Sequence, residues 1–142
     1  MLRNSTSLSQ NASYHATDEF ITLNHVMPIL WDEKRRQAII DEHRGNPIGK
    51  PGKAGKPVVQ HSDDLAHVLD KLRRAPLAGK EVRIEIEPFK KYAIGILPGE
   101  RGLPVKILDD VIYSTGDECE HAIFLRRVAM MLAKYPAPAK SA

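Results

Sequence analysis

The sequence predicts an α+β fold, in which an antiparallel meander of three to four strands is flanked by two helices and preceded by an N-terminal helical appendage. Three features support this prediction: helical spacing of apolar residues after Ser62, alternation of apolar and charged residues from residue 82, and a wide apolar stripe that ends at Tyr135. The chain has 142 residues, of which 42% are hydrophobic and 6% aromatic. We therefore expect one core that is mostly aliphatic.

The expected organisation is one folded domain with appended segments. The first residues are rich in Ser, Asn and Thr, which cannot bury enough surface to offset the entropy lost on ordering. A stretch rich in Gly and Pro later interrupts any regular element. We therefore expect a flexible tail over 1–19, a helical segment over 20–43, a basic linker over 44–57, an α+β core domain over 58–136 and a C-terminal tail over 137–142.

The N-terminal segment predicts one helix over residues 29–43. Pro28 suits the first turn of a helix, where its missing N–H costs nothing. The apolar side chains of this segment are scattered between charges and do not share one face, so we expect shallow packing and exposed apolar groups. Exposed apolar groups are typical of a partner surface. The candidate partner-binding residues are Trp31, Ile39 and Ile40.

The linker is basic along its whole length. Arg44, Lys50, Lys53 and Lys56 follow one another with no acidic residue between them. The stretch does not fit a phosphate-binding loop, because Lys56 is followed by Pro57 instead of the Ser or Thr that binds magnesium. Lysines on a flexible backbone can still neutralise the phosphates of a nucleic acid.

Residues 62–75 predict an amphipathic helix. Ser62 occupies the N-cap position, and two aspartates follow in the first turn, where carboxylates favour the helix dipole. Arg73 and Arg74 occupy the last turn, and Pro76 stops the helix. The apolar side chains with helical spacing are Leu65, Val68, Leu69 and Leu72.

The strands follow this helix directly. Residues 82–87 and 92–97 each alternate between two faces, and residues 105–113 extend the sheet. Asp109 and Asp110 predict a tight turn or a bulge, so the number of strands is three or four. Because the connections are short, neighbouring strands are expected to be antiparallel.

The last helix begins after Thr115. Thr115 and Glu118 have the spacing of a capping box, and Pro136 ends the helix. Its apolar stripe consists of Phe124, Leu125, Val128, Met131, Leu132 and Tyr135.

The order of these elements resembles that of small immunity proteins of bacterial polymorphic toxin systems. The stretches that carry the resemblance are the helix His61–Leu72, the strands Val82–Ile86 and Tyr92–Leu97, and the turn Tyr113–Asp117. The resemblance covers residues 61–136 and implies a compact α+β domain that binds and blocks one toxin.

Reactive side chains near the start of the last helix do not form a complete site. Asp117 and His121 lie four residues apart and can hold two corners of a metal site. Cys119 lies near a helix N-terminus, which favours the thiolate. Residues two apart on a helix point in different directions, so His121 is not positioned as its base. We therefore expect no catalytic residue, no metal and no cofactor. The sequence does not decide whether the protein is an enzyme, but it favours a non-catalytic role.

The favoured function is non-catalytic binding of another macromolecule in protein interaction or regulation, with another protein or a second copy of this chain as the partner. One alternative is a small enzyme or metal-binding protein that uses residues 117–121. The single cysteine and the lack of an apolar run of about 18 residues favour a cytoplasmic protein without a membrane partner. The other alternative is nucleic-acid binding through Arg44, Lys50, Lys53, Lys56, Arg73 and Arg74.

Overall fold

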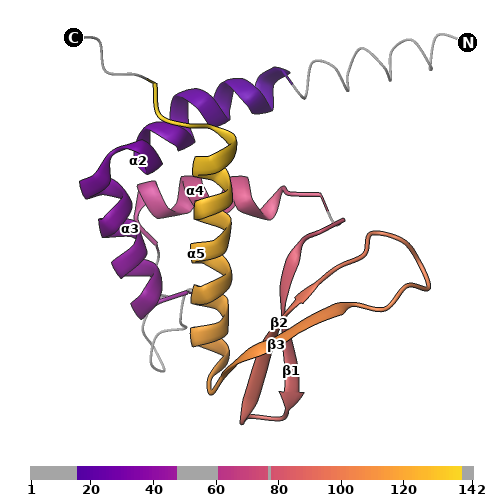
Figure 1. Ribbon diagram of the computed structural model, residues 1–142. Coiled ribbons are helices and arrows are strands. Elements are labelled where there is room, and N and C mark those ends of the chain that lie inside the picture. Colours follow the sequence, from indigo (N-terminus) through magenta and orange to yellow (C-terminus); the bar gives the residue numbers. More distant parts are fainter. Residues whose placement is uncertain (1–15, 48–60, 77, 139–142) are drawn as a thin grey trace, which may run out of the picture.

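The chain forms a group of helices beside a three-stranded sheet (Figure 1). The computed structural model describes residues 16–47, 61–76 and 78–138. A helix over residues 16–21 comes first. It is followed by the π-helical turn η1 (Thr22–Val26), α2 (Met27–Trp31), α3 (Glu33–Gly45), α4 (Asp63–Arg73), β1 (Glu81–Glu87), β2 (Lys91–Ile96), β3 (Lys106–Tyr113) and α5 (Gly116–Lys134).

The strands form an antiparallel meander in the order β1-β2-β3, which confirms the predicted α+β fold with three strands in the described chain. On β3 the register is irregular. Ile94 pairs with Leu108, and Tyr92 pairs with Tyr113, so residues 109–112 face a single residue of β2. The aspartates expected in a turn or bulge lie in this irregular stretch.

Both predicted helix caps are present. The Ser62 hydroxyl accepts a hydrogen bond from the N–H of Leu65 at 3.3 Å, and the Thr115 hydroxyl accepts one from the N–H of Glu118 at 3.2 Å. These side chains satisfy N–H groups that have no partner within the helix. The α5 helix contacts all three strands, whereas α4 contacts α3 and η1.

The expectation of one continuous helix over residues 29–43 was wrong, because the helix breaks at Asp32. This residue is extended and caps α3, since its carboxylate accepts from the N–H groups of Lys34 and Arg35 at 3.0 and 3.1 Å. Shallow packing was also wrong: Leu30 and Ile39 lie on opposite sides of the break, and both are fully buried. A single helical period cannot describe two helices.

The core has two parts. A large apolar cluster joins the N-terminal helices, α4 and the C-terminal half of α5, and a small cluster lies between β2 and α5. The small cluster contains Ile94, Cys119 and Ile123. The large cluster contains Val26, Met27, Ile29, Leu30, Ile39, Leu65, Val68, Leu69, Leu72, Phe124 and Val128.

Candidate functional site

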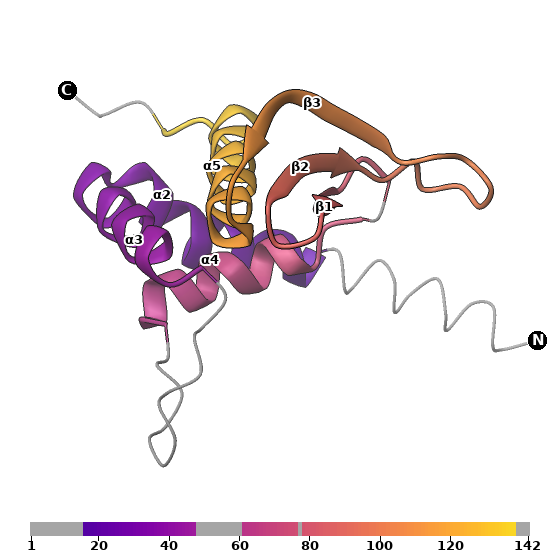
Figure 2. The ribbon, with the colours of Figure 1, turned by 90° about the horizontal axis from the view of Figure 1, so that it is seen from below.

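The sheet has a second face, turned away from α5. Ile94 points toward α5, where it packs with Cys119 and Ile123. Gly95 points the other way, because a Cβ atom there would lie 2.5 Å from Cγ1 of Ile84. The described helices lie to one side of the strands in both views (Figures 1 and 2).

We define the outer face of the sheet by its apolar side chains. Val82 is the register partner of Gly95, and Ile84 lies two residues further along β1, so both point to this face. Ile107 belongs to the same face because it is the register partner of Gly95. The outer face therefore consists of Val82, Ile84, Val105 and Ile107.

Small residues in the central strand shape this face. A Cβ atom at Gly95 would also lie 2.8 Å from Cγ1 of Val105, so Ile84 and Val105 close over β2 from both sides. Ile107 remains 45% exposed on this face. The result is a row of branched aliphatic side chains that extends over all three strands and reaches solvent.

The turn between β1 and β2, at one end of the sheet, presents an exposed aromatic ring. Phe89 is 90% exposed and has a φ of 62°, in the left-handed region. Its N–H donates to Oε1 of Glu85 at 3.3 Å. This conformation costs a residue with a Cβ atom about 1–2 kcal/mol. Strain of this kind, combined with an exposed aromatic ring, is typical of a functional position.

Charged side chains surround the turn. The Glu87 carboxylate lies 3.6 Å from the ammonium group of Lys90 and 3.8 Å from that of Lys91, and all three side chains are well exposed. An apolar centre with a polar rim is the usual anatomy of a protein interface.

The three candidate partner-binding residues lie elsewhere. The Trp31 indole is half-buried and donates to the main-chain oxygen of Tyr135 at 2.9 Å. Ile39 is buried in the large cluster, and Ile40 packs against that cluster. All three therefore hold the N-terminal helices against the rest of this chain.

Two of the candidate nucleic-acid-binding arginines face carboxylates of this chain. The guanidinium of Arg44 lies 3.2 Å from Asp41, and that of Arg74 lies 3.1 Å from Asp18. Arg73 is exposed and lines a small cavity. The candidates outside the described residues are Lys50, Lys53 and Lys56.

The structure separates the reactive residues of the 117–121 stretch. Cys119 is completely buried, and its thiol donates to the main-chain oxygen of Ala93 at 3.5 Å. Burial raises the pKa of this thiol to about 11. His121 faces α3 instead. Among the described residues, no three His, Cys, Asp or Glu side chains are arranged to hold a metal ion.

The structure contains a buried pair of histidines that no pattern in the sequence predicted. The Nδ1 atoms of His43 and His121 lie 2.8 Å apart, and the His43 ring stacks on Phe124 with 4.0 Å between ring centroids. Burial and the neighbouring His121 lower the pKa of His43 to about 4, and burial also lowers the pKa of His121. The spacing of four residues places Ile39 and His43 on one helix face, but the sequence predicted Ile39 to be exposed, so it gave no signal of a buried histidine.

These observations define a small α+β protein whose antiparallel meander has helices on one face and an exposed apolar outer face. No helix in the described residues is long and apolar enough to cross a bilayer. The chain belongs to the N,N-dimethylformamidase alpha subunit family, whose model matches residues 31–136. This is a different family from the immunity proteins that the order of elements resembles. No curated protein matches the sequence.

Proposed function

We propose that this protein is a non-catalytic subunit of an N,N-dimethylformamidase-type enzyme and that it binds a protein partner through the outer face of its sheet. The family description names an enzyme subunit, which supports a protein partner in an assembly. The observation that carries the proposal is the exposed Phe89 ring in the turn at the end of β1 and β2, the strands next to the apolar outer face.

The chemistry of the outer face favours a protein as the occupant. Large aromatic side chains in a desolvated centre supply most of the binding energy of protein interfaces. The Phe89 ring has almost no contacts within its own chain, since it is 90% exposed. Burial of the ring in a pocket of the partner would also offset the cost of its left-handed backbone.

The non-catalytic part of the proposal rests on how the reactive groups are used. The thiol of Cys119 is protonated and bonded to a main-chain oxygen, and the two buried histidines bond to each other. Cys119 packs between β2 and α5, on the side of the sheet away from the outer face, and the histidines join α3 to α5.

The test is co-purification of the tagged chain with the catalytic subunit of an N,N-dimethylformamidase from the same source. Replacement of Phe89 by Asp should weaken the complex by about tenfold or more, as expected for an aromatic residue that becomes buried in an interface. The matched control is Phe20→Asp, because Phe20 is also exposed, at 60%, but lies on the N-terminal helix.

Equal affinity of the wild-type and Phe89→Asp chains would contradict the proposal, as would a loss of binding in the Phe20 control only. Sedimentation of the chain alone distinguishes a second copy as the occupant. A homodimer that Phe89→Asp dissociates would assign the outer face to self-association and would overturn its assignment to another subunit.

A further inference from the structure

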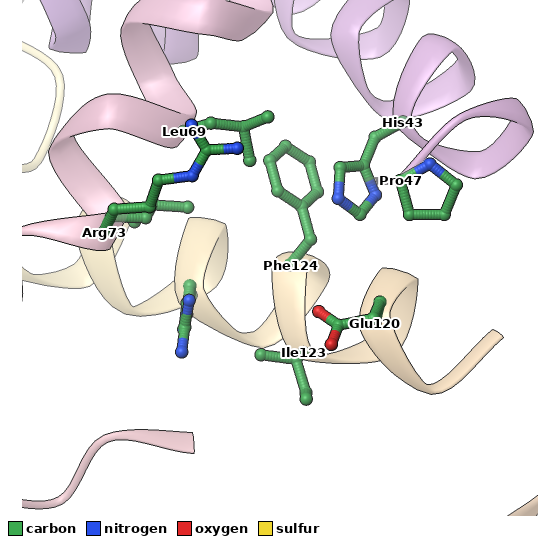
Figure 3. A pocket seen from close by; sticks show the side chains of 9 residues that line it. His43, Pro47, Leu69, Arg73, Glu120, Ile123 and Phe124 are labelled. Carbon is green, nitrogen blue, oxygen red and sulfur yellow. The ribbon is translucent and has the colours of Figure 1, made fainter. Parts of the chain in front are cut away.

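A cavity of about 200 Å³ opens between the end of α3, α4 and the middle of α5 (Figure 3). It lies in the helical part of the molecule and is independent of the outer face of the sheet. Its apolar walls include Leu69 and Phe124. The charged and polar groups that line it are His43, Arg73, Glu120 and Arg127.

His43 lines this cavity and is bonded to His121, so the protonation of this pair can be assigned. The contact between its Nδ1 and Nδ1 of His121 requires one proton. Nε2 of His121 is buried without a partner among the described residues, and an orphaned N–H costs more than an orphaned lone pair. We therefore assign the shared proton to His121. The neutral ring of His43 then carries its own proton on Nε2, the nitrogen not used in the pair.

The charges that line the cavity favour an anion. The guanidinium of Arg73 makes no hydrogen bond or ion pair with another residue of the described chain. The guanidinium of Arg127 donates to the main-chain oxygen of Glu81 and remains cationic. Among the described residues that line the cavity, Glu120 is the only acid, and its carboxylate lies 3.9 Å from the guanidinium of Arg83.

The size and the walls of the cavity restrict the anion. The His43 ring stacks on one face of the Phe124 ring, and Arg73 lies on the other side of that ring, so a small anion is bound by Arg73 and not by both residues (Figure 3). A space of about 200 Å³ holds several water molecules, or a ligand of about six non-hydrogen atoms. The aromatic and aliphatic walls favour an apolar group on that ligand.

We propose that this cavity binds a short-chain aliphatic monocarboxylate. Its carboxylate group accepts hydrogen bonds from the guanidinium of Arg73, and its alkyl chain packs on Leu69 and on the side of the Phe124 ring away from His43. Guanidinium groups suit this role because they present paired donors in the geometry of a carboxylate.

The test uses butyrate as the probe and follows the ring C–H signals of His43 and His121 by NMR at pH 7.5. We expect a saturating change in both signals. Butyramide, which has the same shape without the charge, should bind about tenfold more weakly or not at all, because charge-assisted hydrogen bonds are the stronger ones.

Variants locate the binding. Arg73→Gln should weaken butyrate binding by about tenfold, whereas Arg44→Gln removes an equal charge outside the cavity and should leave it unchanged. Arg73 is exposed, so its replacement is compatible with folding. A change that does not saturate, equal binding of butyramide, or unchanged binding by Arg73→Gln would each overturn the proposal.

Discussion

The indole N–H of Trp31 donates a hydrogen bond to the main-chain oxygen of Tyr135, 104 residues further along the chain. The two residues lie at the end of α2 and just after α5, so this bond joins the N-terminal helices to the C-terminal helix. They also stand at the two ends of the segment that matches the family.

Replacement of Trp31 by Phe should remove this bond and leave the oxygen of Tyr135 without its donor. We expect the free energy of unfolding to fall by about 1–3 kcal/mol, measured by urea denaturation followed by circular dichroism. Phe20→Leu, on an exposed side chain, is the control and should have little effect. An unchanged midpoint in Trp31→Phe would show that the bond does not stabilise the fold.

Gly95→Ala tests the close approach of side chains over the central strand. The new Cβ atom would lie 2.5 Å from Ile84 and 2.8 Å from Val105, so both side chains must move. We expect a loss of about 1–3 kcal/mol in the free energy of unfolding. Gly45→Ala is the matched control, because a Cβ atom at Gly45 meets nothing within 4 Å. Equal stability of the two variants would contradict this geometry.

The histidine pair should make stability depend on pH. The pKa of His43 is about 4 in the folded state and about 6.5 in the unfolded state, so the unfolded chain binds more protons between these values. The contribution of His43 is therefore complete above about pH 6.5 and is lost as the pH falls to about 4. The full loss amounts to about 3 kcal/mol.

Chemical denaturation at pH 7.5 and pH 4.5 measures this effect. In His43→Gln the difference between the two pH values should become smaller, because the titrating ring is gone. His25→Gln removes an exposed histidine and should retain the wild-type difference. If the pH dependence in His43→Gln equals that of the wild type, another group is responsible.

Cys119 should be unreactive in the folded protein. Its thiol is fully buried, and its pKa is raised to about 11, so little thiolate is present at pH 8. A colorimetric thiol reagent should react slowly with the native chain and rapidly with one thiol per chain in denaturant. Fast reaction in native buffer would instead indicate an accessible, activated cysteine.

Local patterns in the sequence were sufficient for the second half of the fold. Ser62 and Thr115 cap their helices as their spacing predicted. The alternation over residues 82–87 and 92–97 led to the observed meander. Caps and alternation act between residues that are close in sequence, so they can be read without the tertiary structure.

The N-terminal segment shows where such patterns fail. The carboxylate of Asp32 ends one helix and starts another, so the apolar residues follow two helical periods and look unpatterned as one. Trp31, Ile39 and Ile40 therefore suggested a partner surface, although Ile39 is buried in the core of this chain.

By itself, the sequence determined the α+β class, the antiparallel order of the strands and the ends of α4 and α5, because each depends on contacts between near neighbours along the chain. The tertiary structure decided which apolar face is left uncovered, and it brought His43 to His121 across 78 residues. Both depend on how α3 and α5 pack, and packing between distant segments follows from the shape of the whole core.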